Sequence, residues 1–281
     1  MSPAPVKVGI STCPNDTFAF HALMEGIVEV PGLEFEFHLA DVQELNEAAT
    51  AGTFDVVKIS YAAAIELGDR FSMLPVGSAL GFGVGPVVIA RSGWGQDAIG
   101  DRTRILCPGR QTTATLLWEL FHPRAPEPSQ RPFFEILPAL ERREADLGVC
   151  IHEGRFTYMD HGLELLEDLG RTWEEATRAP LPLGGIAVQD GKMSEHAAAI
   201  GRGLRDSIEW AHAHPEAALL SMRKHAQEHS DEVLWKHVEL YVNDWTIDLG
   251  VDGRRAIEEL ASRAASSENR ARASMLTVLE I

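Results

Sequence analysis

The segment from residue 147 to residue 155 has the residue types of an acid–base site. It reads Leu-Gly-Val-Cys-Ile-His-Glu-Gly-Arg, so an apolar run stops abruptly at His152. Such a run is typical of a buried strand in a parallel sheet, and open α/β sheets bind ligands just beyond the carboxyl ends of their strands. His152 thus places an imidazole, which titrates near neutral pH, where such folds bind small molecules. The alternative is a histidine that caps the strand or satisfies loop carbonyls.

A second candidate site follows the predicted strand at residues 103–107. Gly109 would let the backbone approach a ligand, and Thr112 and Thr113 stand where a helix begins. Unpaired N–H groups at the start of a helix bind anions. The segment lacks the Gly-Lys-Ser/Thr of a nucleotide-binding loop, which favours a carboxylate over a polyphosphate. Plain helix capping by threonine is an equally good interpretation.

Polar residues also follow the predicted strand at residues 6–10. Asn15 and Asp16 either cap the next helix or form hydrogen bonds with ligand hydroxyls. Cys13 lies beside them, but no base is adjacent to it in the sequence, which disfavours a nucleophilic thiol. The segment is thus a candidate binding loop.

Two further segments add candidate binding residues. Lys58 lies in the apolar strand 54–59, which ends at Ser60. Its amine either pairs with a buried carboxylate or extends to water. The run 77–86, Gly-Ser-Ala-Leu-Gly-Phe-Gly-Val-Gly-Pro, includes Ser78. Its glycines allow close approach of the backbone, so it is either a ligand loop or a structural loop.

Alternating strands and helices must position these residues. Strands are predicted at 6–10, 33–39, 54–59, 84–90, 103–107, 147–151 and 164–169. Helices are predicted at 18–25, 42–51, 62–67, 112–121, 138–143 and 173–178, the second opened by a capping box at 41–44 and the fifth by Pro138. Alternation of this kind indicates parallel strands with right-handed crossovers.

The remainder of the chain is predicted to be mainly helical, with helices at 194–213, 230–242 and 252–266 and another that starts at His214-Pro215. We therefore predict an α/β fold of two lobes. Lobe I combines residues 1–92 with 187–281, and lobe II, residues 93–186, is inserted between them, with a hinge at 92–101. The chain would cross between the lobes twice and leave a central cleft, which is a preferred place for a ligand.

Composition limits the possible partners. The chain has 281 residues and a net charge of −17, with a pI of about 5.0. This charge argues against nucleic acid and against an anionic membrane surface. An anionic small molecule stays possible if the attraction is local. A small carboxylate is the expected partner, and a homodimer is the assembly that we consider.

The cysteines and the N-terminal segment indicate the compartment. The three cysteines include no Cys-x-x-Cys pair, so neither a disulfide framework nor a zinc site is indicated. The first ten residues do not form a secretion signal. No apolar run reaches the roughly 18 residues that span a bilayer. We therefore expect a cytoplasmic protein.

Several sequence blocks resemble the 1,4-dihydroxy-6-naphthoate synthase family of the futalosine route to menaquinone. The resemblance covers nearly the whole chain and is carried by Cys-Pro-Asn-Asp-Thr-Phe (13–18), Asp-Val-Gln-Glu-Leu-Asn (41–46), Lys-Ile-Ser-Tyr (58–61), the glycine-rich run 77–86, Pro-Gly-Arg-Gln-Thr-Thr-Ala (108–114), Ile-His-Glu-Gly-Arg-Phe-Thr-Tyr (151–158), Leu-Pro-Leu-Gly-Gly (181–185) and Tyr-Val-Asn (241–243). This family implies a fold similar to type II periplasmic binding proteins. It also implies cleavage of cyclic dehypoxanthine futalosine to 1,4-dihydroxy-6-naphthoate, with no metal or organic cofactor.

The resemblance also implies roles for residues. The proposed catalytic base of the family falls on His152, and we expect Asp16 to relay a proton. The expected substrate-binding residues are Asn15, Asn46, Lys58, Ser60, Ser78, Gly109, Thr112, Thr113 and Arg155. Loss of the sugar-derived fragment by carbon–carbon cleavage would make the enzyme a lyase.

Other functions are compatible with the same fold. One is a carboxylate-binding protein, and another is the sister chorismate dehydratase. The effector domain of a transcription regulator is disfavoured because no helix-turn-helix precedes the first strand. Substrate turnover separates the synthase from these alternatives.

Overall fold

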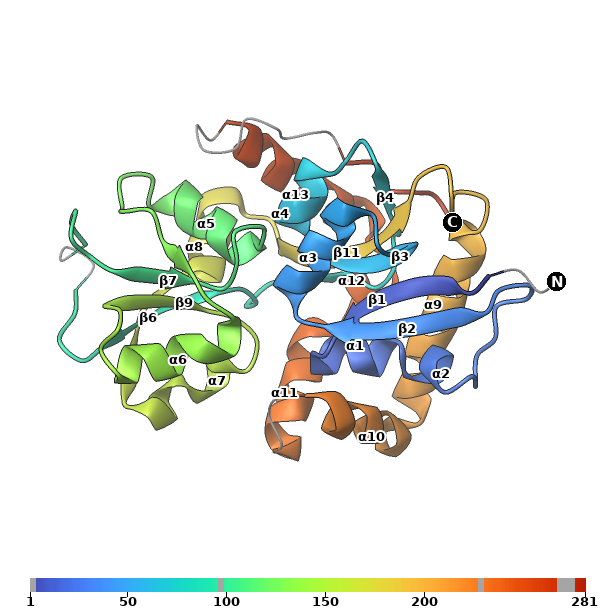
Figure 1. The fold of residues 1–281 in the computed structure, drawn as a ribbon, viewed down its shortest axis with the longest axis horizontal. Coiled ribbons are helices and arrows are strands. Elements are labelled where there is room, and N and C mark those ends of the chain that lie inside the picture. Colours follow the sequence, from blue (N-terminus) through green and yellow to red (C-terminus); the bar gives the residue numbers. More distant parts are fainter. Residues whose placement is uncertain (1–3, 96–98, 227–229, 267–275) are drawn as a thin grey trace.

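The computed structural model describes residues 4–95, 99–226, 230–266 and 276–281, which form two β-sheets side by side (Figure 1). The first sheet has the order β2-β1-β3-β11-β4, with β5 also paired to β11. Its strands are β1 (Val6–Ser11), β2 (Phe35–Ala40), β3 (Val56–Ser60), β4 (Phe71–Met73), β5 (Ala79–Gly81) and β11 (Leu181–Gln189). The second sheet has the order β10-β6-β9-β7-β8. Its strands are β6 (Val87–Arg91), β7 (Ile105–Cys107), β8 (Ser129–Gln130), β9 (Leu147–Cys150) and β10 (Leu163–Asp168).

Strand direction follows the connections. Strand β1 pairs in parallel with both β2 and β3, and β7 pairs in parallel with β9, as the strand–helix alternation predicts. Strand β11 returns from the second sheet and pairs antiparallel with β3, β4 and β5. Strands β6 and β10 are antiparallel to their neighbours in the second sheet. Each lobe is therefore a mixed sheet.

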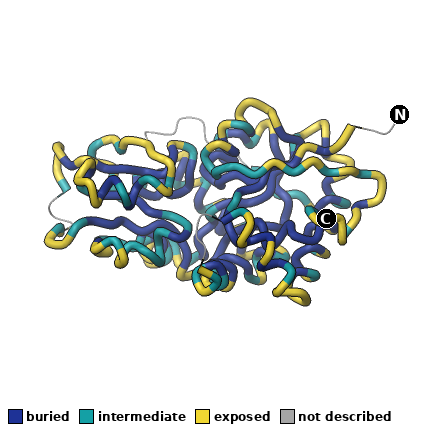
Figure 2. The backbone as a smooth tube through the Cα atoms, turned by 60° about the horizontal axis from the view of Figure 1, so that its bottom comes forward, coloured by how far each residue is buried: buried dark blue, intermediate teal, exposed yellow. Residues whose placement is uncertain are grey.

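Helices cover both faces of the first sheet (Figure 1). One layer contains α3 (Val42–Ala51), α4 (Tyr61–Glu66) and α13 (Gly250–Ala265). The other contains α1 (Pro14–Ala19), α2 (His21–Met24), α9 (Ala197–Ala213), α10 (Pro215–His225) and α11 (Asp231–Tyr241), with the short α12 (Asp244–Ile247) after it. The second sheet packs against α5 (Thr113–Phe121), α6 (Phe133–Glu141) and α8 (Leu169–Thr177), and α7 (Gly154–Thr157) is followed by a 3-10 turn (Tyr158–His161). Figure 2 shows that burial is concentrated along the strands.

Two helix starts differ from the prediction, whereas a third agrees. The capping box opens α3, with Asp41 and Glu44 each bonding to backbone N–H groups as expected. Helix α1 begins at Pro14, whose fixed φ suits the first helical position, so the expectation that Asn15 or Asp16 caps this helix is wrong. Helix α6 extends on both sides of Pro138 rather than beginning there. The proline removes one bond, to the carbonyl of residue 134, whose side chain is exposed.

The chain changes sheet between β5 and β6, and again between α8 and β11. By sheet membership both changes fall earlier than the expected lobe boundaries at residues 92 and 186, because β6 already belongs to the second sheet and the whole of β11 belongs to the first. The first crossing is the glycine-rich run, where Gly85 has a φ of 122° that favours glycine. Residues 96–98 of the expected hinge lie outside the described residues. Within the described residues, no helix is both long and apolar enough to cross a membrane.

Candidate active site

A cavity that is open to solvent lies where the two lobes meet, with about 650 Å³ of empty space when the open solvent at its mouth is included. Seven of the expected site residues line it, from both lobes: Asn15, Asp16, Lys58, Ser60, Thr112, Thr113 and His152. Four do not: Asn46, Ser78, Gly109 and Arg155. The strand ends therefore converge on one space, as the position of ligand sites in α/β sheets predicts.

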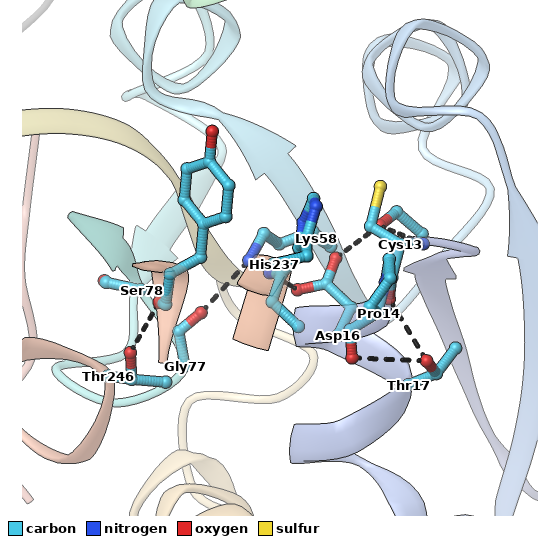
Figure 3. A network of polar contacts seen from close by, with 12 residues as sticks. Cys13, Pro14, Asp16, Thr17, Lys58, Gly77, Ser78, His237 and Thr246 are labelled. Carbon is cyan, nitrogen blue, oxygen red and sulfur yellow. Dashed lines mark hydrogen bonds and ion pairs between the residues drawn. The ribbon is translucent and has the colours of Figure 1, made fainter. Parts of the chain in front are cut away.

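A buried ion pair forms the floor of lobe I at this cavity (Figure 3). Lys58 Nζ lies 2.7 Å from Asp16 Oδ1, and the two side chains are 6% and 4% exposed. The same ammonium donates to the carbonyl oxygen of Gly77, 3.2 Å away, and Ser11 Oγ donates to Asp16 Oδ2 at 2.6 Å. Of the two interpretations of Lys58, pairing with a buried carboxylate is thus confirmed. Its charge is largely balanced before any ligand arrives.

The pair is extended by Asn15 toward a histidine that the sequence analysis did not select. Asn15 Nδ2 donates to Asp16 Oδ1 at 2.8 Å, and Asn15 Oδ1 lies 3.0 Å from His237 Nε2. His237 and Tyr241 project from α11 into the cavity lining. Burial lowers the pKa of His237 well below its ordinary value, with His152 and Lys58 adding to the effect. The i, i+4 spacing of a histidine and a tyrosine on a predicted helix was the available signal.

His152 is the second residue after the end of β9 and has a left-handed backbone, φ 54°. Non-glycine residues seldom adopt this conformation, and histidine is among those that do so more often. Its imidazole borders the cavity and meets the edge of the Phe133 ring, with 4.7 Å between ring centroids. Burial lowers the pKa of His152 to about 4; Lys58 adds to this effect and Asp16 opposes it. The ring is therefore neutral at pH 7, the form that a base requires.

Cys13 brings its thiol against this imidazole from the opposite lobe. The sulfur lies 3.3 Å from His152 Nδ1 and 3.6 Å from Nε2. Burial raises the pKa of the thiol well above its ordinary value, and the carboxylates of Glu153 and Asp16 raise it further. A thiol held in its protonated form is a poor nucleophile, in agreement with the sequence analysis. Within the described residues, no group of three or more His, Cys, Asp or Glu side chains could hold a metal ion.

The two threonines at the start of α5 use their hydroxyls inside the protein. Thr112 Oγ1 donates to the Gly109 carbonyl and accepts from the N–H of Thr115, which is plain N-capping. Thr113 Oγ1 donates to the Leu183 carbonyl at 2.7 Å, across the lobe boundary. Their side chains thus position the helix, and a carboxylate would meet backbone N–H groups instead.

Those backbone groups are available. Neither Thr113 nor Ala114, the first two residues of α5, uses its N–H in a hydrogen bond within the described part of the chain, and both line the cavity. The N–H groups at the start of a helix carry partial positive charge and bind anions. An anion bound as the sequence predicts would meet these N–H groups, and its binding stays a prediction.

Asn46 acts through Ser60 rather than by lining the cavity. Asn46 Nδ2 donates to Ser60 Oγ at 3.1 Å, and Asn46 Oδ1 accepts from the Ser60 N–H at 2.9 Å. The same amide also donates to the Gln111 carbonyl of lobe II at 3.3 Å. Because Ser60 Oγ accepts this bond, its own O–H can point at a ligand. Asn46 is consequently a positioning residue in this arrangement.

Three other expected binding residues lie behind the cavity wall. Ser78 Oγ and Tyr61 Oη are 2.7 Å apart. Arg155 pairs with Asp168 at 2.7 Å and donates to carbonyls of the glycine-rich crossing. Gly109, with a φ of 132°, packs against the Gln43 side chain and leaves no room for a Cβ. A direct role of Ser78, Gly109 or Arg155 in binding substrate stays a prediction.

Comparison with known proteins identifies the family. Residues 6–266 match the family model described as menaquinone biosynthesis. The chain is 44% identical over 259 residues to the 1,4-dihydroxy-6-naphthoate synthase of Thermus thermophilus, covering 92% of this chain and 93% of the relative. It is 39% identical over 272 residues to the enzyme of the same name from Streptomyces coelicolor, covering 95% of each.

Solved structures support the same fold. A protein from Archaeoglobus fulgidus superposes with a TM-score of 0.87 and 34% identity, over 93% of this chain and 97% of that one. A Candida albicans protein with the generic periplasmic binding protein fold superposes with a TM-score of 0.63 over 99% of this chain and 98% of that one, at 11% identity, which shows the fold alone. The predicted two-lobed α/β architecture is confirmed, and the chain belongs to the menaquinone biosynthesis family.

Proposed function

We propose that this protein is a 1,4-dihydroxy-6-naphthoate synthase that acts as a carbon–carbon lyase on cyclic dehypoxanthine futalosine. The observation that carries the proposal is a neutral imidazole, that of His152, in the same cavity as the free N–H groups at the start of α5. The names of the Thermus and Streptomyces relatives agree with it. The cytoplasmic location expected from the sequence goes with this assignment as a prediction.

The two ends of the cavity would hold two ends of the substrate. The aryl carboxylate accepts hydrogen bonds from the N–H groups of Thr113 and Ala114, with the O–H of Ser60 nearby. The sugar-derived part then extends toward lobe I, where Asp16 and Asn15 border the cavity. This orientation places the reacting spirocyclic carbon between the lobes, within reach of His152.

His152 then removes a proton from the spirocyclic substrate. The electron pair of the broken C–H bond forms a carbon–carbon double bond in the ring as the bond to the sugar-derived fragment breaks. That fragment departs with the electron pair of the broken bond and takes up a proton. The remaining ring system becomes aromatic, which drives the release. Asp16 would relay a proton to or from the sugar hydroxyls, although its contact with Lys58 keeps it largely occupied.

The low pKa of free His152 is compatible with this role. A base is most effective when its pKa lies near the working pH. A bound carboxylate brings negative charge into the cavity, and nearby negative charge favours the imidazolium form. Substrate binding would therefore raise the pKa of His152 from about 4 toward neutrality. The base would gain strength only when substrate is present.

Turnover by His152 variants tests the proposal. Purified protein is incubated with cyclic dehypoxanthine futalosine, and the naphthoate is followed by absorbance and mass. His152→Asn is the sharper substitution, because asparagine tolerates the left-handed backbone but cannot take up the proton. We expect it to lose about 10²–10⁴-fold in kcat. His161→Ala is the matched control. The His161 imidazole pairs with Glu141 on the surface of lobe II, so its removal should leave kcat unchanged.

Other results of this assay would indicate a different base or a different function. Near-full turnover by His152→Asn would move the base to another residue, with Asp16 tested next. Substrate binding by the wild-type protein without turnover would leave a carboxylate-binding protein. Conversion of chorismate instead would indicate the sister dehydratase.

A further inference from the structure

His237 has a buried ring at the edge of the cavity. The residue is 1% exposed, and its ring lines the cavity between the lobes. Nε2 is bonded to Asn15, but Nδ1 has no hydrogen-bond partner among the described residues. Leaving a buried polar atom unpaired is unfavourable. Because the His237 ring lines the cavity, a ligand seated against it would supply the missing donor.

The protonation of this ring is fixed by the chain of bonds behind it. The Asp16 carboxylate accepts from Lys58, so the group of Asn15 that faces it must be the NH₂. Asn15 Oδ1 therefore faces His237 Nε2, and an oxygen acceptor requires that Nε2 carry the proton. Nδ1 is then a bare lone pair. Lys58 sets the tautomer of a ring that it does not touch, through Asp16 and Asn15.

The surroundings keep this ring neutral and in place. Its pKa is lowered by burial, by His152 and by Lys58, so no second proton is bound at neutral pH. The ring centroid lies 6.1 Å from that of His152, with 25° between the planes, and 4.6 Å from that of Tyr241. The two neutral imidazoles thus stand next to each other in one cavity. His152 is the ring assigned to take up a proton, whereas His237 donates from Nε2 to Asn15 and has only an acceptor, Nδ1, left over.

We propose that His237 Nδ1 accepts a hydrogen bond from a hydroxyl of the sugar-derived part of the substrate. This proposal deepens the proposed function and rests on it. A cationic donor is disfavoured because Lys58 lies close by, which leaves neutral O–H donors. The carboxylate end of the substrate is held by α5 of lobe II, so the hydroxylated end faces lobe I, to which α11 belongs. His237 is then a specificity-determining residue for the hydroxylated end.

Two conservative variants separate this role from a scaffolding role. Glutamine places its amide nitrogen near the position of Nε2, so His237→Gln keeps the bond to Asn15 and loses the acceptor. Asparagine places its amide oxygen near the position of Nδ1, so His237→Asn keeps an acceptor and loses the bond to Asn15. The two substitutions remove opposite halves of the same ring.

In steady-state kinetics with cyclic dehypoxanthine futalosine, a binding role and a scaffolding role of His237 predict opposite orders of KM for the two variants. If Nδ1 binds the hydroxyl, His237→Gln raises KM by about 5- to 150-fold, the range expected for one unpaired buried group, and His237→Asn raises it less. If the ring only supports Asn15, His237→Gln resembles wild type and His237→Asn is the impaired variant. A KM for His237→Gln that does not exceed that of His237→Asn overturns the proposal.

A spectroscopic readout separates failure here from failure of the proposed function. Protein labelled with ¹⁵N-histidine should show Nε2 protonated and Nδ1 unprotonated, and addition of substrate should shift Nδ1 as it accepts a hydrogen bond. A protonated Nδ1, or an Nδ1 signal that substrate leaves unchanged, overturns the proposal even if turnover is normal. Absence of naphthoate from wild type, with the Nδ1 shift intact, overturns the proposed function and supports the hydroxyl contact.

Discussion

Replacing Lys58 with methionine removes one half of a buried ion pair and leaves the other half in place. The two side chains are 6% and 4% exposed, and their charged atoms are 2.7 Å apart. Asp16 keeps its bonds to Ser11 and Asn15, so its carboxylate stays partly satisfied. Breaking one partner of a buried pair costs about 3–5 kcal/mol, because an uncompensated charge is left inside. We expect Lys58→Met to lower the free energy of unfolding by this amount.

Urea denaturation followed by circular dichroism measures the loss. Lys236→Met is the matched control, because Lys236 pairs with Glu232 on the surface, where the side chains are 52% and 75% exposed. That exposed pair contributes little, so the control should unfold at nearly the wild-type urea midpoint. Adding Asp16→Asn to Lys58→Met removes the uncompensated charge and should restore part of the stability. A loss below about 1 kcal/mol for Lys58→Met, or a double variant less stable than the single one, would refute this reasoning.

Three further predictions concern pH, the crossing and the lobe boundary. Burial lowers the pKa of His152 from 6.5 to about 4, so its neutral form stabilises the fold above pH 6.5 and this contribution is lost as the pH falls toward 4. Across that pH window, the urea midpoint should therefore fall less in His152→Asn than in wild type. Gly170→Ala should lower the free energy of unfolding by about 1–3 kcal/mol because a Cβ would collide with the Val84 carbonyl. Gly100→Ala, with open space around the added Cβ, should leave it unchanged. Equal urea midpoints for the two variants would contradict this prediction. Thr113→Val should lower the free energy of unfolding by about 1–3 kcal/mol and raise KM, because it leaves the Leu183 carbonyl unpaired and loosens the start of α5. Thr113→Ser should behave as wild type. An unchanged KM in the valine variant would remove the anion-site assignment.

The sequence predicted the parts of the site that follow strands. Ser60 and His152 each come directly after an apolar run, and the carboxyl ends of strands meet in α/β folds, so the order of residues alone was enough to assign both to the cavity. The capping box at Asp41 determined the start of α3 because its signal is contained in four residues. Local patterns of this kind are independent of tertiary packing.

The parts that the sequence could not predict depend on packing between distant segments. His237 reaches the cavity because α11 packs against α1, a long-range contact that the i, i+4 spacing of His237 and Tyr241 does not by itself specify. Asn15 was expected as a cap because the helix start was placed after it, although Pro14 was the better signal. Asn46 and Arg155 were assigned to the substrate, but their hydrogen bonds are with Ser60 and Asp168, contacts that only the folded chain creates.

The position of β11 has a consequence for how the chain folds. All strands of the second sheet lie between residues 87 and 168, so that lobe can form as soon as this stretch has been synthesised. The first sheet must wait for residues 181–189, because β11 enters it between β3 and β4, and both of those strands end by residue 73. Until then both strands present open edges, which are templates for aggregation. The nascent chain should therefore depend most on chaperones while its second lobe is already native, and the slow phase of refolding should be the insertion of this late central strand.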